Sequence, residues 1–113
     1  MNINSERVVQ PLTNYIPAEL KRDRYWGSLL FLFMHHQKLN RLLRAKYIDL
    51  NEQIVNVHGL RAAVRGWSHS EKFMLQLALH LFNERNKFNL SDMDYLDDYN
   101  KQLALRAIQI RFS

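Results

Sequence analysis

Five histidines offer the most versatile chemistry in this chain, because imidazole serves both as a metal ligand and as a general acid or base. They are His35, His36, His58, His69 and His80. No two are four residues apart, as two ligands on one helix face would be, and the chain has no cysteine to complete a zinc site. His69 and His80 would be separated by about 16 Å of helical rise. The histidines therefore predict no metal site.

Two further combinations resemble catalytic or metal sites but lack features that such sites need. Ser68 precedes His69, yet adjacent residues in a first helical turn diverge, and no glycines form an elbow around the serine. A cluster of aspartates lacks the glycine and the distal glutamate of a calcium loop; it consists of Asp92, Asp94, Asp97 and Asp98. With three glycines in all, the chain cannot build a phosphate loop or a dinucleotide fingerprint. We expect a protein that is not an enzyme and has no cofactor.

The segment from Trp67 to Asn83 predicts a central, buried helix. Ser68 and Glu71 have the spacing of a capping box, which marks a helix start. The residues that follow are apolar nearly all round, apart from a narrow polar stripe, and such a helix belongs in a core. We expect this helix to span about residues 69 to 84.

A second, longer helix is expected from Pro17 to about residue 46, with Gly27 as a point at which it can bend. One side carries the expected core stripe: Tyr25, Leu29, Leu32, Leu39, Leu42 and Leu43. The opposite side is apolar in its first half and polar and basic in its second: Trp26, Leu30, Phe33 and Met34, then Gln37, Lys38, Arg41 and Arg44.

The remaining segments complete an all-α domain. Residues 50 to 58 suit a short helix or a short strand equally well, because Ile54, Val55 and Val57 are β-branched. A short helix should follow from residue 60 to 65, with Gly66 as a left-handed stop, and a last helix from about 98 to 112. We expect one domain over residues 1–113, a compact bundle of four or five helices around the 69 to 84 helix, with residues 1–16 as a loose arm.

The N-terminal sequence and the length of the apolar runs bear on localisation. The first residues lack the basic stretch and long apolar run of a signal peptide. The longest apolar run, from Leu29 to Met34, is far shorter than the roughly 20 residues that cross a bilayer. We therefore expect a cytoplasmic protein with no membrane partner.

The net charge of +5 is concentrated in one part of the chain. Residues 1 to 66 hold ten Lys or Arg against five Asp or Glu, whereas residues 67 to 113 hold six of each. Between Pro17 and Ile48 there are seven basic residues and two acidic ones. This excess is typical either of a solvated helix face or of a surface that meets phosphates or an acidic protein.

The apolar half of the long helix's second face has two interpretations. The N-terminal arm could cover it through Val8, Val9, Leu12 and Ile16. Otherwise Trp26, Leu30, Phe33 and Met34 would be exposed and, with the neighbouring basic residues, would form a homodimer seam or a partner groove, since aromatic, Met and Arg side chains are enriched in interface cores.

The C-terminal half of the chain resembles a known group of proteins. The pattern W-S-x-S-E from Trp67, the apolar helix ending L-F-N, and a recurring final motif resemble small, uncharacterised proteins of Gram-positive bacteria and of their phages and plasmids. The final motif corresponds to Leu96, Asp97, Asn100, Leu103, Ala107, Ile108 and Arg111. The resemblance covers roughly residues 60 to 112. It implies a mobile-element origin, in which small proteins commonly block larger host machinery, and it supplies no catalytic residues.

Three hypotheses follow for the function. The first is a regulator or inhibitor of mobile-element type that docks on a host protein, such as a defence nuclease, through Trp26, Leu30, Phe33, Met34, Lys38, Arg41 and Arg44. The second is a nucleic-acid-binding protein that uses the same basic segment, through Lys38, Arg41, Arg44, Lys46 and Tyr47. The third is a structural homodimer. The absence of a helix-turn-helix signature counts against the second hypothesis.

Overall fold

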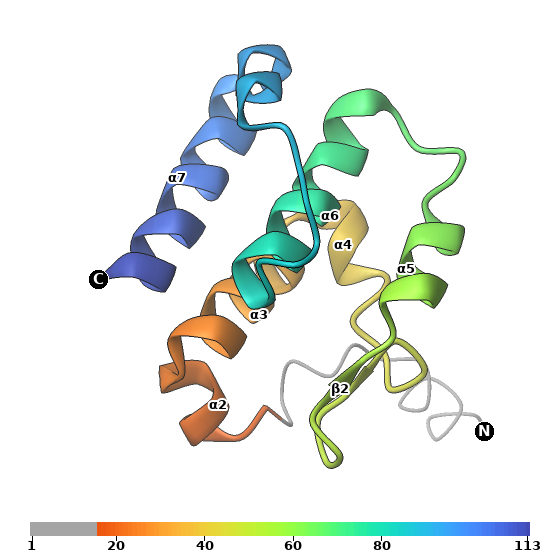
Figure 1. Ribbon diagram of the computed structural model, residues 1–113, viewed down its shortest axis with the longest axis vertical. Helices are drawn as coiled ribbons and strands as arrows, with labels where there is room; N and C mark the ends of the chain where they lie inside the picture. The colour runs from red at the N-terminus through yellow and green to blue at the C-terminus, as the bar shows by residue number, and fades with distance from the viewer. Residues whose placement is uncertain (1–15) are drawn as a thin grey trace, which may run out of the picture.

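The computed structural model describes residues 16–113, and its fold is predominantly α-helical (Figure 1). In chain order the elements are α2 (Ala18–Arg22), α3 (Arg24–His35), α4 (Gln37–Asn40), β1 (Ile48–Asp49), β2 (Ile54–Val55), α5 (Val57–Ala63), α6 (His69–Phe82), the 3-10 helix η2 (Leu90–Tyr95) and α7 (Asp98–Phe112). No helix in this part of the chain is both long enough and apolar enough to span a bilayer. The arm residues Val8, Val9 and Leu12, which were considered as a cover for the long helix, lie outside the described residues.

The core is built where α3, α6 and α7 pack against one another. In Figure 1, α7 lies on one side of α6 and α5 lies on the other, and the β1–β2 hairpin projects from one end. The all-α fold class is therefore confirmed, with the small hairpin as an addition.

The central helix α6 is confirmed together with its start. The Ser68 hydroxyl accepts a hydrogen bond from the Glu71 amide at 3.2 Å, and the Glu71 carboxylate accepts from the Ser68 amide at 3.0 Å. These two bonds satisfy amides that have no partner inside the helix. Seven of the fourteen residues of α6 are buried, among them Phe73 and Leu77. The helix ends at Phe82, two residues earlier than expected.

The prediction of one long helix from 17 to 46 is wrong, because two residues each end one helix and begin the next. The Asp23 amide donates to the Glu19 carbonyl at the end of α2, while its carboxylate accepts from the amides of Tyr25 and Trp26 at the start of α3. His36 repeats this arrangement between α3 and α4, where its Nδ1 accepts from the Leu39 amide. Beyond α4 the chain continues as turns to residue 47.

Gly27 has a different role from the expected bend, since α3 runs through it without interruption. A Cβ atom at this position would lie 2.7 Å from the backbone carbonyl oxygen of Lys21. Gly27 therefore allows the end of α2 to lie against α3, which any larger residue would prevent without a shift of backbone.

The open question at residues 50 to 58 has a divided answer, because Ile54–Val55 form strand β2 whereas residues 57 and 58 begin α5. Ile48 pairs with Val55 and Asp49 with Ile54 in antiparallel register. The Asp49 carboxylate accepts from the amides of Asn51 and Glu52, each at 3.0 Å, which closes a turn. The β-branched residues on the far side of this turn favour strand over helix.

The helix after the hairpin begins earlier than expected, at Val57, because the Asn56 side chain accepts from the Gly59 amide and caps it. Gly66 is not a left-handed stop, since no glycine among the described residues has a positive φ. The side chains of Leu60 and Val64 are buried and anchor α5 to the core.

The last helix, α7, begins as expected after Asp97, whose carboxylate accepts from the Asn100 amide at 2.8 Å. Side chains from both of its ends bind carbonyl groups at the C-terminal ends of other helices. The Tyr99 hydroxyl donates to the His35 carbonyl at 3.1 Å, and Arg111 Nε donates to the Leu81 carbonyl at 3.1 Å. These bonds fix α7 against α3 and α6 and satisfy carbonyls that a helix end leaves without a partner.

We predict that Leu77→Ala and Leu81→Ala each lower the free energy of unfolding by about 2 to 5 kcal/mol, the range for large-to-small changes in a packed core. Both leucines are buried, with 0% and 3% exposure. Denaturant midpoints at constant pH measure the effect. Gln102→Ala, at an exposed position of α7, is the control and should change stability by less than about 0.5 kcal/mol. Unchanged midpoints for both leucine variants would contradict the central position of α6.

Candidate functional site

The apolar surface expected on the first long helix is interior. Trp26, Leu30 and Phe33 are exposed by 8%, 1% and 0%, so the docking surface that they were expected to form is wrong. Trp26 packs edge to face on Phe82 of α6, with the ring centroids 4.8 Å apart, and α7 packs along α3. Met34 is half-buried against the core. Two helices cover the face, whereas the sequence analysis considered the N-terminal arm as its cover; of the arm residues named there, Ile16 is described and is buried.

The expected basic residues do lie at the surface, although they no longer continue the face of α3. Lys38 belongs to α4, and Arg41 is its exposed C-terminal cap. Arg44 is half-buried, and its Nε donates to the Arg41 carbonyl at 2.8 Å. Lys46 Nζ lies 5.1 Å from the ring centroid of the half-buried Tyr47. The chain therefore presents these cations from a short helix and a series of turns.

Lys38 connects α4 to the start of α6. Its Nζ lies 3.0 Å from a Glu71 carboxylate oxygen and 5.3 Å from the centroid of the Trp67 ring. The Ser68 amide, and then Lys38, hold the pKa of Glu71 below its ordinary value because both stabilise the carboxylate. Both members of the ion pair are partly exposed, so the pair contributes little to stability and mainly positions Lys38 beside the indole.

One groove runs where α4, α6 and α7 begin. Lys38 and Arg41 line it from one side, and Glu71, Asp97 and Tyr99 are among the residues that line it from the other. Its cations are thus matched by carboxylates, and its surroundings are polar. This groove favours no single sign of charge on a ligand.

A second groove, between α5 and α6, has a different charge. Arg61 of α5, Arg65 of the turn that follows α5, and Lys72 of α6 line it, with the Gln76 amide beside them. Val64 and Leu75 form its apolar part. None of the described residues that line it is acidic. An uncompensated group of cations of this kind attracts anions, phosphates above all.

Trp67 precedes Ser68, the N-cap of α6, and its half-buried indole packs against the core with Lys38 over the ring. We name the basic face by its members, which line the two grooves: Lys38, Arg41, Arg61, Arg65 and Lys72. The sequence reasoning missed the part formed by α5. The signal in the sequence was the pair of cations Arg61 and Arg65, close together in the chain, although Arg65 lies in the turn after α5.

His36 is the one histidine with a buried side chain among the described residues, at 6% exposure. Its Nδ1 accepts from the Leu39 amide at 3.3 Å and so caps α4, which carries Lys38. Burial lowers the pKa of His36, and the carboxylates of Glu71 and Asp97 oppose this effect in part. The ring must stay unprotonated at Nδ1 to accept this bond, so the neutral form supports the start of α4.

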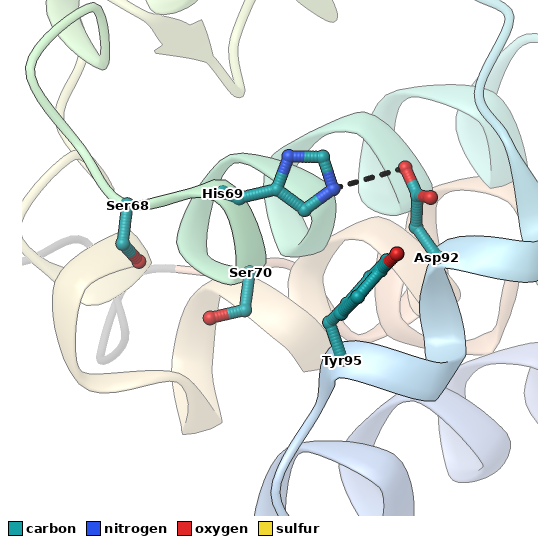
Figure 2. Close-up of a pocket in the computed structure, with 5 residues that line it drawn as sticks. All are labelled: Ser68, His69, Ser70, Asp92 and Tyr95. Carbon is teal, nitrogen blue, oxygen red and sulfur yellow. Dashed lines mark ion pairs between the residues drawn. The ribbon is translucent and has the colours of Figure 1, made fainter.

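A third hollow contains a histidine and an aspartate, and Figure 2 shows its lining residues. His69 Nε2 lies 3.2 Å from a carboxylate oxygen of Asp92, and the His69 ring packs edge to face against Tyr95. The hydroxyl groups of Ser68 and Ser70 point away from the His69 ring (Figure 2). The geometry supplies no serine positioned for activation by this histidine. The contact instead joins η2 to the start of α6.

The described part of the chain does not bring together the side chains of a metal site. Within residues 16–113, no three His, Asp or Glu side chains gather in a way that could hold a metal ion. The cluster of four aspartates is spread over η2 and the start of α7, where Asp97 caps the helix.

Comparison with known proteins finds no matching family, no matching curated protein and no matching solved structure.

We predict that His36 makes the protein less stable at mildly acidic pH. Its pKa is lowered by folding, so the unfolded chain binds the additional proton first as the pH falls below about 6.5, the ordinary value. The stabilisation is complete above that pH and is lost as the pH falls towards the lowered pKa. Urea unfolding between pH 7.5 and pH 5 measures the slope, and His36→Asn, which keeps a capping side chain, should flatten it. An unchanged slope would contradict this role.

Proposed function

We propose that the protein is a non-enzymatic binding protein that recognises nucleic acid through the basic face. The observation that carries the proposal is the groove lined by Arg61, Arg65 and Lys72, in which no described residue supplies a carboxylate. Phosphates are the anions that such a group of Arg and Lys side chains suits best, since Arg binds phosphate oxygens with two parallel hydrogen bonds.

The burial of α3 removes the main argument for a protein partner over a nucleic acid. A protein partner was preferred because Trp26, Leu30 and Phe33 were expected to form an apolar docking surface. These side chains are interior, and docking on them would require α6 or α7 to detach. The exposed residues of α4 and α5 and of the turns that follow them include Arg41, Arg61 and Arg65 and no large apolar side chain, which suits phosphates better than the apolar core of a protein interface.

The basic face also has a suitable layout for a chain of phosphates. Lys38 and Arg41 lie on one side of the start of α6, and Arg65 and Lys72 lie on the other. Arg61, Arg65 and Lys72 would supply the phosphate contacts, and Arg41 could add one on the other side, where Lys38 is paired with Glu71. Such contacts bind without reading sequence, so the proposal concerns the class of partner and not a particular sequence.

A second candidate is a regulator of mobile-element type that docks on a host protein. The outer face of α7 favours it, because Leu105 and Phe112, two turns apart, are 57% and 65% exposed. On this proposal Leu105→Lys prevents partner capture or self-association, measured by sizing and pull-down, and leaves nucleic-acid binding intact.

We predict that replacing Arg61, Arg65 and Lys72 together with alanine strongly weakens nucleic-acid binding. Each lost phosphate contact should reduce the slope of log K against log salt by about 0.7 on single strands and about 0.9 on duplex DNA. The control replaces Arg22, Lys101 and Arg106 with alanine, which removes the same charge from α2 and α7, across α6 from α5 (Figure 1). Fluorescence anisotropy at several salt concentrations measures both variants.

The proposal fails if the wild-type protein shows no salt-sensitive affinity for any single-stranded or duplex nucleic acid. It fails equally if the two triple variants lose the same affinity, because binding would then reflect net charge and not the basic face.

A further inference from the structure

The outer face of α7 exposes two large apolar side chains. Leu105 is 57% exposed and Phe112 is 65% exposed, although the helix packs its other side on α3 and α6. Figure 1 shows α7 at the edge of the fold, with α3, α5 and α6 all on one side of it. The outer face is therefore accessible to a partner along the length of the helix.

The same face carries opposite charges two helical turns apart. Asp98 lies in the first turn of α7 and Arg106 lies eight residues later, and both are exposed. The rise of about 12 Å between them is too long for an ion pair within one helix. Neither residue belongs to the ion pairs found among residues 16–113. The Arg106 guanidinium donates to the Gln109 side chain at 2.9 Å, which holds it on the outer face.

These side chains form one stripe. At 3.6 residues per turn, the exposed residues of the stripe fall within about 120° of the helix circumference. They are Asp98, Gln102, Leu105, Arg106, Gln109 and Phe112. The stripe is thus acidic near its start, amide-bearing in the middle and basic towards its end, with apolar side chains along it.

A second copy of α7 that runs antiparallel to the first complements this stripe. With the two-fold axis between residues 102 and 103, Asp98 of one copy lies opposite the turn that carries Arg106 of the other, and the contact occurs twice. The two Leu105 side chains approach each other beside the axis. A parallel pair would instead place aspartate against aspartate and arginine against arginine. A polyanion suits the stripe less well, because Asp98 repels it.

We propose that the protein forms a homodimer through the outer face of α7, with the two helices antiparallel and Asp98 of each copy paired with Arg106 of the other. The dimer leaves the groove of Arg61, Arg65 and Lys72 accessible, because α5 lies across α6 from α7 (Figure 1). Two such grooves in one particle would strengthen the binding of a long polyanion through avidity. The dimer itself does not depend on what the grooves bind.

The test is a charge reversal in the full-length protein. Asp98→Arg alone brings arginine against Arg106 of the second copy, and Arg106→Asp alone brings aspartate against Asp98. Each variant should weaken dimerisation at least about 10-fold, because two pairs per dimer become repulsive. An equimolar mixture of the two variants should associate about as tightly as the wild type, because both ion pairs are restored in the mixed dimer. Sedimentation velocity over a concentration series measures the association.

A second pair of variants tests the apolar part of the stripe. Leu105→Lys should give a monomer, because it places a charge where the two helices pack together. Ile54→Lys is the matched control, since Ile54 is 58% exposed in the hairpin, and it should leave the dimer intact. Thermal unfolding by circular dichroism checks that each variant is folded, and this pair decides the question if a charge variant does not fold.

The outcomes are distinct from those for nucleic-acid binding, because no nucleic acid is present. A wild-type protein that stays monomeric up to about 0.5 mM overturns the dimer, since even a small specific interface associates below that concentration. A dimer that Leu105→Lys leaves unchanged overturns the assignment to α7. Two folded charge variants whose mixture stays monomeric overturn the antiparallel pairing.

Discussion

The burial of α3 on more than one side is the constraint on which the rest of the structure depends. Its residues from Trp26 to Leu30 are all buried, which requires one helix against each side of it. α6 provides one cover and α7 the other. Because α6 and α7 are both needed to cover α3, all three helices are part of the core. The exposed cations that line the two grooves therefore come from α4, α5, the turns after them and the start of α6.

Helix ends, and the side chains that bind them, then place the charged residues. Asp23 and His36 divide the first helical segment, so Lys38 and Arg41 turn away from α3 and approach the start of α6. Tyr99 and Arg111 bind carbonyls of α3 and α6 and hold α7 in place. Asn56 starts α5, which brings Arg61 and Arg65 to face Lys72. Each of these contacts is local, and together they create a basic face that no single segment contains.

The sequence predicts α6 and the start of α7 well, because Ser68, Glu71 and Asp97 are strong local signals that act within three residues. It predicts the break at His36 poorly, since histidine is not among the preferred capping residues and its role depends on burial against other helices. Trp26 and Leu30 are covered by α6 and α7. These are tertiary contacts, which the periodicity of a single helix does not predict. The same holds for the groove of Arg61, Arg65 and Lys72, whose residues come from two elements.

The central claim is that the apolar side of α3 is interior and that ligands meet the protein at the basic face. The most direct measurement is an NMR titration of the labelled protein with oligothymidylate, following the indole N–H signals of its two tryptophans and the backbone amides. The account predicts that the amides around Arg61, Arg65 and Lys72 shift, while the Trp26 indole does not. Shifts confined to the outer face of α7, or a shift of the Trp26 indole, would contradict it.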